Sequence, residues 1–316
     1  MTVLILARDL DPTADAMVAT LTERGTAVAR VNTGWFPTQL SVSAGLRGGR
    51  WSGHLHTPGQ LVFLDDVHAV WYRGPEAYRM PAELSDAERH HAFLEAKYGL
   101  GGVLSSLDAV WVNHPSRMAD AAYKPVQLVR AQQCGLTVPD TLITNEADPV
   151  REFATEPTIT KLLGSNTLSE DGTRKVSWSR LLDQAELADL RGIETTTHLL
   201  QRWVPKDFEV RVVAIGEQLF AVAIHAGSTS TRVDWRCDYD ALSYAPIEPP
   251  EGVAAGIRAL LDRFGLVYGA LDFVVTPNGD WVFLEINPGG QYGWLEAATD
   301  HPLTSTLADL LSKGTA

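Results

Sequence analysis

Apolar residues along this chain recur with the spacing of strands in some segments and of helices in others. This pattern predicts the order of the elements. A continuous apolar run at 3–7 is typical of a parallel strand that is covered on both faces. It is followed by apolar residues with the i, i+3, i+4, i+7 spacing of a helix, namely Ala14, Met17, Val18 and Leu21. Gly25 lies near the expected end of that helix, and a second strand is expected at 27–32. The chain therefore opens with a β-α-β unit.

This open α/β pattern continues to about residue 115. The stretch LRGGRWSGH predicts a hairpin or a loop, and AVWYRGP at 69–75 predicts a strand that enters a turn. Ser85 and Glu88 form a capping-box pattern, so a long helix is expected from there towards Leu107. AVWVNHP at 109–115 predicts another strand, which ends at proline.

From Lys124 onward short strands dominate. KPVQLVRAQQCG predicts a helix with proline in its first turn and glycine at its C-terminal end. Strands are expected in VPDTLITN, PTITKLLG, HLLQRWV, FEVRVVAIG and QLFAVAIHAG, the last two joined by a tight turn at Gly216. One further helix face is formed by Val253, Ile257, Leu260, Leu261 and Phe264. ALDFVVTPNGDWVFLEINP predicts two strands around a turn, so the last two thirds are expected to be α+β with an antiparallel sheet.

The last of these strands ends in polar residues. Residues two apart on a strand point to the same face, so Glu285 and Asn287 in FLEIN are expected to share one. Leu284 and Ile286 are expected to point away. Asp272 lies on the preceding strand, and antiparallel pairing could bring its carboxylate to the same place. Two carboxylates and an amide oxygen suit Mg²⁺ or Mn²⁺, which would predict a bound nucleotide, although a solvated acidic hairpin is the simpler alternative.

Basic residues and one interrupted strand strengthen the nucleotide interpretation. Lys161 ends an apolar run where a buried cation needs a partner, and Lys124 opens a helix, although either could be a surface lysine. LLQRWVPKDFEVRV gives a strand, an interruption at proline and a return strand. Backbone groups near 201–204 could pair with the edge of a purine. Arg211 follows Glu209 by two residues, on the same strand face.

Composition and charge narrow the class of partner. The 316 residues are enough for two or three subdomains, and 45% hydrophobic with 21% charged residues is typical of a soluble globular protein. The formal net charge of −13 argues against non-specific binding to nucleic acid or to an anionic membrane. Cys134 and Cys237 are expected to be ordinary thiols in a reducing cytoplasm. No basic segment precedes the first apolar run, so neither a signal peptide nor a spanning helix is expected.

Taken in order, these parts resemble the ATP-grasp ligases. A lysine before a helix, a second lysine on a strand, QRWV, EVRVVAIG and LDFVV…VFLEINPGG carry the resemblance over most of residues 110–295. It implies an ATP-grasp fold, in which two α+β lobes enclose ATP and Mg²⁺ behind an open α/β domain. The implied boundaries are 1–115 for the N-terminal pre-ATP-grasp domain, 116–200 for the central lobe and 201–316 for the C-terminal lobe with the metal site.

The same resemblance implies roles for residues of this chain. The candidates for binding ATP are Lys124 and Lys161 at the phosphates or the N7 side of adenine, Gln201, Arg202, Trp203 and Val204 as the adenine hinge, and Glu209. The candidates for holding Mg²⁺ are Asp272, Glu285 and Asn287. Many relatives carry a glycine-rich loop after the strand lysine. LLGSNTLSEDGTRK has only two glycines, which leaves the role of the loop at 164–175 open.

Longer stretches resemble the maturases of graspetides, which are ribosomal peptides crosslinked through ω-esters or ω-amides. These stretches include AVWYRGP, QRWVPKDFEVRVVAIG and HAGSTSTRVDWR. The resemblance implies a macrocyclase that uses ATP to convert Asp or Glu side chains of a precursor peptide to acyl phosphates and joins them to Ser or Thr hydroxyls or Lys amines. It also implies recognition of a leader segment apart from the core, and relatives suggest a homodimer.

Such chemistry needs no enzyme nucleophile, because the protein positions groups and stabilises charge. Arg211 is the candidate for stabilising the transferring phosphoryl group, since its planar fork suits phosphate oxygens. Lys206 and Arg236 are candidates for binding the acidic core peptide, although Arg236 could instead pair with a nearby aspartate. His225 could be a base and Arg73 could reach the cleft, but a structural histidine and an interdomain ion pair are the simpler alternatives.

Three alternatives stay open. Another ATP-grasp carboxylate–amine ligase, which adds amino acids to a protein tail or a small molecule, would keep the ATP site and change the acceptor; VPK and DWR argue against it. A nucleotide-binding regulator without turnover is a different class, against which the full set of candidate residues argues. A Rossmann-type oxidoreductase is suggested by the opening β-α-β unit, but no G-x-G-x-x-G turn follows the first strand.

Overall fold

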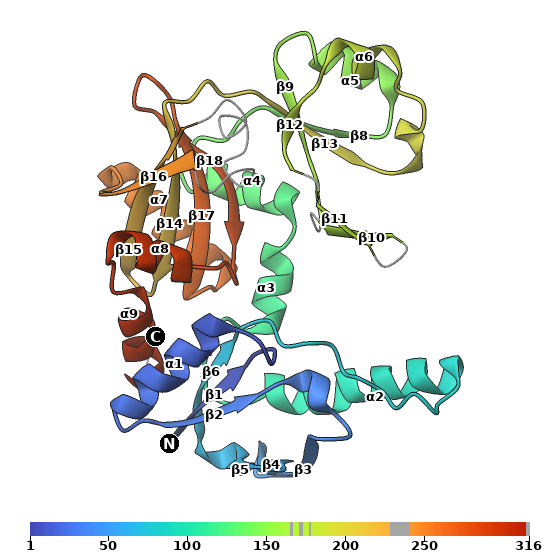
Figure 1. Ribbon diagram of the computed structural model, residues 1–316, viewed down its shortest axis with the longest axis vertical. Coiled ribbons are helices and arrows are strands. Elements are labelled where there is room, and N and C mark those ends of the chain that lie inside the picture. The colour runs from blue at the N-terminus through green and yellow to red at the C-terminus, as the bar shows by residue number, and fades with distance from the viewer. Residues whose placement is uncertain (165–166, 171–172, 177, 228–240, 314–316) are drawn as a thin grey trace.

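The structure is a computed structural model that describes residues 1–164, 167–170, 173–176, 178–227 and 241–313. The molecule is elongated, and its N-terminal region lies at one end (Figure 1). A four-stranded parallel sheet in the order β2-β1-β6-β7 forms this region. Its strands are β1 (Thr2–Leu6), β2 (Ala27–Val31), β6 (Val67–Tyr72) and β7 (Val110–Val112). The predicted parallel β-α-β unit is therefore confirmed.

Helices cover both faces of the parallel sheet. These are α1 (Pro12–Glu23) and α2 (Asp86–Ser105), and the capping box predicted at Ser85 and Glu88 is present. Because side chains alternate along β1, Val3 and Ile5 pack in the core on the α1 side, whereas Leu4 and Leu6 pack in the core on the α2 side. The first strand is thus buried on both faces, as its continuous apolar run indicates.

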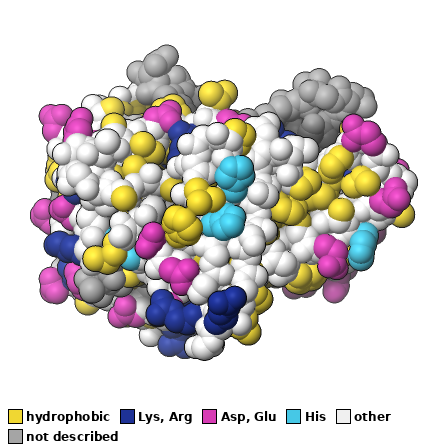
Figure 2. All heavy atoms as spheres, turned by 90° about the horizontal axis from the view of Figure 1, so that it is seen from below, with side chains coloured by type: hydrophobic (Ala, Val, Ile, Leu, Met, Phe, Trp, Pro, Cys, Tyr) yellow, Lys and Arg dark blue, Asp and Glu magenta, His cyan; other side chains and the backbone are white. Residues whose placement is uncertain are grey.

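A small antiparallel sheet extends the N-terminal region. It consists of β3 (Ser41–Arg47), β4 (Arg50–Thr57) and β5 (Gln60–Phe63), flanked by the 3₁₀ helices η1 (Thr33–Trp35) and η2 (Leu64–Asp66). The stretch that predicted a hairpin or a loop is the β3–β4 hairpin. Seen from below, hydrophobic and histidine side chains gather near the centre of this end of the molecule, with charged side chains around them (Figure 2).

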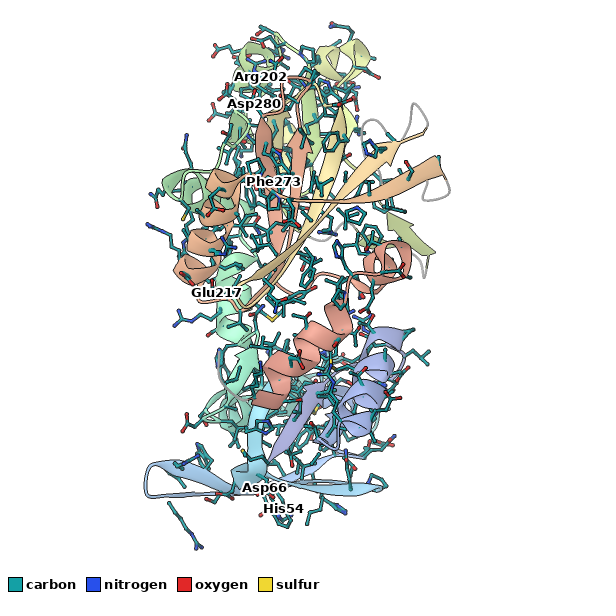
Figure 3. All side chains as sticks on the ribbon, turned by 90° about the vertical axis from the view of Figure 1, so that its left-hand side faces the viewer. His54, Asp66, Arg202, Glu217, Phe273 and Asp280 are labelled. Atoms are coloured by element: carbon teal, nitrogen blue, oxygen red, sulfur yellow. The ribbon has the colours of Figure 1, made fainter. Side chains whose placement is uncertain are left out.

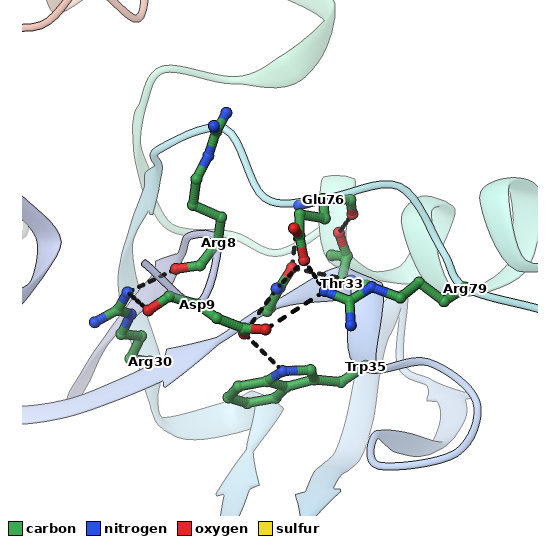
Figure 4. A network of polar contacts seen from close by, with 9 residues as sticks. Arg8, Asp9, Arg30, Thr33, Trp35, Glu76 and Arg79 are labelled. Atoms are coloured by element: carbon green, nitrogen blue, oxygen red, sulfur yellow. Dashed lines mark hydrogen bonds and ion pairs between the residues drawn. The ribbon is translucent and has the colours of Figure 1, made fainter. Parts of the chain in front are cut away.

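Polar side chains tie together the segments that follow the ends of β1, β2 and β6. The Nδ2 atom of the buried Asn32 donates to Asp9 Oδ1 at 2.9 Å and to Glu76 Oε2 at 2.7 Å. Trp35 Nε1 also donates to Asp9 Oδ1, at 2.8 Å, and Arg79 forms ion pairs with both carboxylates. Figure 4 shows the resulting network, which holds the segment around Glu76 against the sheet.

Two helices lead from the N-terminal region into a second, mainly antiparallel lobe. They are α3 (Pro115–Ala121) and α4 (Lys124–Gln133). The lobe has the strand order β12-β9-β13-β8, with strands β8 (Thr141–Thr144), β9 (Thr158–Lys161), β12 (Arg180–Leu181) and β13 (His198–Arg202). Its other elements are α5 (Ala147–Phe153), β10 (Thr167–Glu170), β11 (Thr173–Val176), α6 (Gln184–Ala188) and η3 (Ile193–Thr195). The boundary expected at 200–201 falls inside β13, which pairs with strands of this lobe.

A five-stranded antiparallel sheet forms the third part, in the order β16-β15-β14-β17-β18. Its strands are β14 (Phe208–Ile215), β15 (Gln218–Ala226), β16 (Leu242–Ile247), β17 (Tyr268–Val275) and β18 (Trp281–Asn287). The helix α7 (Glu251–Phe264) packs on one face, where the predicted apolar residues of the helix meet Phe273 in a shared core. Figure 3 shows Phe273 on this sheet, and the antiparallel arrangement expected from the sequence is confirmed.

The chain ends by returning to the N-terminal region. After β18 come α8 (Gly293–Thr299) and α9 (Leu303–Lys313), which the sequence analysis did not predict. Leu303, Leu307 and Leu311 of α9 join the core that contains Met17 and Leu21 of α1. Figure 3 shows α9 between the five-stranded sheet and the parallel sheet. Among the helices of the described residues, none is long and apolar enough to cross a membrane.

Candidate active site

A pocket opens between the second lobe and the five-stranded sheet, with the start of α4 beside it. It collects most of the residues predicted to form the site: Lys124, Lys161, Gln201, Arg202, Trp203, Val204, Lys206, Glu209, Asp272 and Glu285. These residues come from α4, β9, β13, β14, β17, β18 and the segment between β13 and β14. The pocket therefore places cationic side chains opposite carboxylates, as a site for a metal–nucleotide complex requires.

Charged side chains form a row across three neighbouring strands. Arg211 on β14 is paired in register with Asp272 on β17, which is paired with Glu285 on β18. Arg211 Nη1 lies 3.0 Å from Asp272 Oδ1, and both side chains are buried. Lys124 of α4 completes the row, because its Nζ atom lies 2.6 Å from Glu285 Oε2. The two carboxylates are thus neighbours, and each has a cationic partner.

The orientation of β18 differs from the expectation at one residue. The pairing register shifts after Asp272, so that Phe273 pairs with Phe283, and Leu284 becomes the extra residue of a β-bulge. The expectation that Leu284 points away from the site was wrong, because Leu284 lines the pocket with Glu285. Phe283 and Ile286 both face the core instead. Strict alternation fails at a bulge, and the sequence pattern does not reveal where a bulge occurs.

Asn287 lies two residues beyond Glu285, opposite Ala270, and it is exposed. Its Oδ1 atom accepts a hydrogen bond from the backbone N–H of Gly289 at 3.0 Å. An amide oxygen has a second lone pair, so this bond leaves Asn287 able to reach an ion. Asn287 does not line the pocket among the described residues, and its assignment as a metal ligand stays a prediction.

The hinge segment at 201–204 has fewer backbone N–H groups available to a purine than the sequence predicted. The N–H of Arg202 donates to the Asp140 carbonyl at 2.9 Å, and the N–H of Trp203 donates to the Pro157 carbonyl at 2.8 Å. Both donors are therefore used within the lobe. Gln201 is buried, and its Nε2 donates to Thr141 Oγ1 at 3.0 Å. Its buried Oε1 atom accepts no hydrogen bond from any residue in the described part of the chain. Gln201 and Val204 both line the pocket, and their assignment to the adenine hinge stays a prediction.

Lys206 and Glu209 form an ion pair beside the hinge. Their side chains are 9% and 10% exposed, so each charge depends on its partner. Lys206 Nζ also lies 5.3 Å from the centroid of a Trp203 ring, within the range of a cation–π contact. The structure therefore places Lys206 with the hinge residues.

Arg73 and His225 both lie outside the residues that line the pocket. Arg73 is buried in the N-terminal region, with Nε 3.3 Å from Asp11 Oδ2, and its Nη1 atom donates to the Gly289 carbonyl at 3.3 Å. The ion pair of Arg73 is thus within the N-terminal region, and its contact between regions is a hydrogen bond and not the expected ion pair. His225 is exposed on β15, with its ring centroid 5.1 Å from that of Phe208, and it lies outside the pocket lining.

Some predicted features lie outside the described residues. Arg236 and Cys237 belong to the range 228–240, so their predicted roles stay untested. The same applies to 165–166 and 171–172 in the loop whose role was left open. Two residues that line the pocket, Leu162 and Trp178, were missed by the sequence analysis because no motif marks them.

The donor set in the pocket fits Mg²⁺ and ATP. Asp272 and Glu285 offer carboxylate oxygens, which are the ligands that Mg²⁺ prefers, and two carboxylates leave room for water and phosphate oxygens. Among the described residues, no three or more His, Cys, Asp and Glu side chains are placed to hold a metal ion by themselves. A site in which protein side chains supply every ligand, as for Zn²⁺, is therefore not formed among them. Lys124 and Lys161 supply positive charge for phosphates.

Comparison with known proteins gives matches over the whole chain. Residues 2–119 match the MvdD pre-ATP grasp domain. A RiPP-associated ATP-grasp ligase from Chryseobacterium gregarium, solved with ADP and a leader and core peptide, is 26% identical, with a TM-score of 0.90 over 100% of this chain and 97% of that chain. The macrocyclase MdnC from Microcystis aeruginosa, solved with the precursor peptide MdnA, is 27% identical, with a TM-score of 0.87 over 99% of this chain and 100% of that chain.

A third match concerns the fold alone. The ATP-grasp ligase PsnB, complexed with a minimal precursor, Mg and ADP, is 22% identical, with a TM-score of 0.79 over 100% of this chain and 97% of that chain. No curated protein matches this sequence significantly.

Proposed function

We propose that this chain, whose residues 2–119 match the MvdD pre-ATP grasp domain, is an ATP-grasp macrocyclase that crosslinks a ribosomal precursor peptide. The observation that carries the proposal is the cross-strand row of Arg211, Asp272 and Glu285, completed by Lys124; Asp272, Glu285 and Lys124 line the pocket, and Arg211 contacts it through Asp272. Such a row can bind the polyphosphate of a nucleotide together with its divalent ion. The likeness to peptide-bound ligases over the full length supports the choice of a peptide as acceptor.

In the proposed reaction, an Asp or Glu carboxylate of the precursor attacks the γ-phosphorus of ATP. The bond to the bridging oxygen breaks, ADP leaves and an acyl phosphate forms. A Ser or Thr hydroxyl, or a Lys amine, of the same peptide then attacks the acyl carbon and loses its proton, and phosphate leaves. The product is an intramolecular ester or amide. The enzyme contributes orientation and electrostatic stabilisation, with no covalent attachment to its own side chains.

The residues of the pocket divide by the part of ATP that they would bind. Gln201 and Val204 would bind adenine, and Lys124 and Lys161 would bind phosphates. Asp272, Glu285 and Asn287 would hold Mg²⁺, which supplies charge neutralisation at the phosphates when it is bound. Arg211 would stabilise the transferring phosphoryl group through its planar fork.

Two further candidates remain, and only the surroundings of Lys206 are described. Lys206 was expected at the core peptide, but its contacts with Glu209 and Trp203 favour a role beside the nucleotide. Arg236 remains the candidate for binding the acidic core peptide.

Intact-mass spectrometry of a precursor peptide incubated with the enzyme, ATP and Mg²⁺ tests this function. Each ring should remove the mass of one water, and hydroxylamine should open esters and leave amides. Glu285→Ala should abolish the loss. Glu217→Ala is the matched control, because the Glu217 side chain is 91% exposed at the turn after β14 (Figure 3).

Other outcomes of that experiment would contradict the proposal. A mass gain equal to an added amino acid would favour the alternative ATP-grasp carboxylate–amine ligase. ATP bound with no mass change across peptides encoded near this chain's gene would favour a nucleotide-binding regulator.

Oligomeric state and location complete the proposal. We propose a homodimer, as the sequence analysis expected, and a cytoplasmic location, where ATP and a newly made peptide are both present. Light scattering coupled to size-exclusion chromatography measures the first directly. A monomer at micromolar concentration, with full crosslinking activity, would contradict it.

A further inference from the structure

One polar side chain of α4 is buried against the strand that carries Glu285. Gln127 is 3% exposed, and its Nε2 atom donates to the carbonyl of Ile286 at 2.9 Å and to that of Ala121 at 2.7 Å. Its Oε1 atom accepts from the N–H of Ile286 at 3.0 Å. The Gln127 amide therefore bonds both backbone groups of one strand residue.

The position of this contact in the sheet explains its form. β18 is the last strand of the five-stranded sheet, so its outer edge has no neighbouring strand in that sheet. Unpaired backbone groups that are buried carry a cost, and each needs a partner. At Phe283 the partner is the carbonyl of Thr137, at 2.8 Å, and at Ile286 it is the side-chain amide of Gln127. The Gln127 amide thus makes the two hydrogen bonds to Ile286 that a residue of a neighbouring strand would otherwise make.

The same helix face also contacts the neighbouring residue of β18. Lys124 and Gln127 are three residues apart on α4, so their side chains lie on one face of the helix. Lys124 pairs with the carboxylate of Glu285, and Gln127 binds the backbone of Ile286. The helix therefore fixes Glu285 through its side chain and through the peptide that follows it.

We propose that Gln127 is a positioning residue for the divalent ion, because it sets the backbone from which Glu285 and Asn287 project. This inference rests on the proposed function, in which these side chains hold the ion. Removal of the amide leaves the N–H and carbonyl of Ile286 buried without partners, and the strand end must shift to find others. A carboxylate displaced by such a shift binds an ion less well, and loss of a group that orients a ligand typically weakens metal affinity by roughly 10-fold or more.

The test measures Mn²⁺ affinity by electron paramagnetic resonance on the full chain in the presence of AMPPNP. Gln127→Met roughly keeps the volume of the side chain and removes all three of its hydrogen bonds, and it should raise the Kd for Mn²⁺ by about 10-fold. Binding of AMPPNP in EDTA should stay within about twofold, because Gln127 does not line the pocket. Gln127→Glu, which keeps one acceptor and loses the donor, should also weaken Mn²⁺ binding.

Leu128→Ala is the control for stability, because Leu128 lies next in the same helix and belongs to its core. It should lower the Tm and leave the Kd for Mn²⁺ unchanged. If Gln127→Met does not fold, the test uses Gln127→Glu. In that variant, Mn²⁺ affinity should be lower and hydrogen exchange of the peptide around Ile286 should be faster than in the wild type.

The outcomes separate the two claims. A wild-type chain that binds neither AMPPNP nor Mn²⁺ overturns the proposed function, and the inference with it. Wild-type Mn²⁺ affinity in both Gln127 variants overturns the inference alone. Equal weakening by Leu128→Ala also overturns it, because the effect would then reflect general stability.

Discussion

Single residues in the pocket depend on partners contributed by neighbouring strands. Arg211 and Asp272 are both less than a tenth exposed, so removal of either leaves a charge that is poorly solvated. The same reasoning applies to Lys206 and Glu209. Side chains that are proposed to bind nucleotide therefore also contribute to the stability of the sheet that carries them.

We expect Arg211→Ala to lower the free energy of unfolding by about 3 kcal/mol, because Asp272 would remain buried without its partner. Urea denaturation followed by circular dichroism measures this change. Arg191→Ala is the control, since Arg191 pairs with Asp189 on the surface and its side chain is 91% exposed; no measurable change is expected. Unchanged stability of Arg211→Ala would contradict the dependence on the pair.

Hydrogen bonds from Asn32 and Arg79 make the network of the N-terminal region sensitive to acid. The bond from Asn32 is the main cause that lowers the pKa of Asp9 below its ordinary value, and Asn32 followed by Arg79 lowers the pKa of Glu76. A carboxyl whose folded pKa is lowered contributes stability above its unfolded pKa and loses it as the pH falls through the folded value. The wild-type chain should thus lose stability below about pH 4, where unfolded carboxyls begin to bind protons.

Asn32→Ala should partly flatten this part of the pH profile, because the bonds that are the largest cause of both lowered pKa values are gone while those from Arg79 remain. The measurement is the urea midpoint at a series of pH values. Asp65→Ala is a suitable control, since Asp65 is exposed, accepts a bond from Ser52 and lies outside the network. A profile for Asn32→Ala parallel to that of the wild type would show that other carboxyls control acid unfolding.

Part of the candidate site could be predicted at the residue scale. The two-residue period predicted that Glu285 and Asn287 share a face, and the expected antiparallel pairing brought Asp272 beside them; the structure pairs Asp272 with Glu285 in register. Leu284 could not be oriented correctly, because a bulge changes the period locally without changing composition. Gln127 was missed because its importance depends on which strand edge the helix crosses, and one sequence does not show that.

Helices and strands could be predicted where apolar residues recur with a regular spacing. Their packing positions could not be predicted where these depend on contacts between distant segments. The strands of the parallel sheet and the helices α1, α2, α4 and α7 were expected from local patterns, and they are present. The C-terminal helix α9 has an apolar face of Leu303, Leu307 and Leu311 that the sequence analysis overlooked. The place where that face packs, against α1 across almost the whole length of the chain, follows from no local signal.

Shortening a buried side chain of α9 should lower the stability of the N-terminal region, although the two are far apart in the sequence. Leu307 is fully buried in the core shared with α1, so Leu307→Ala should cost about 2–5 kcal/mol of unfolding free energy. Hydrogen exchange in α1 should become faster, which reports the effect at the far end of the sequence. Leu10→Ala is the control, because Leu10 is 88% exposed. Unchanged exchange in α1 would show that the two regions are stable independently.

At the scale of the whole molecule, an acidic chain gathers cationic side chains in one pocket. The formal net charge is −13, yet Lys124, Lys161 and Lys206 line the same pocket, with Arg211 bonded to Asp272 beside them. Cations gathered beside carboxylates suit a small polyanion with its divalent ion, whereas the acidic surface does not favour nucleic acid in general. The overall charge therefore argues against non-specific binding to nucleic acid, and the local arrangement favours a nucleotide.

A nucleotide that binds only the folded chain should raise its thermal stability. AMPPNP with Mg²⁺ at about 100 times its Kd should stabilise the chain by about 2.7 kcal/mol, and differential scanning fluorimetry would detect this as a higher Tm. Glu285→Ala should remove most of the part of the shift that depends on Mg²⁺, whereas Glu217→Ala should retain it. An equal shift in both variants would show that the ion binds elsewhere.

The position of α9 has a consequence for the order in which the protein can mature on the ribosome. Domains that use only early segments can fold as synthesis proceeds. Here the core around Val3, Ile5 and Met17 receives one of its packing surfaces from residues 303–311, which are translated long after these residues. The N-terminal region can therefore complete its core only after α9 has been synthesised, and until then it exposes apolar surface that a chaperone can recognise.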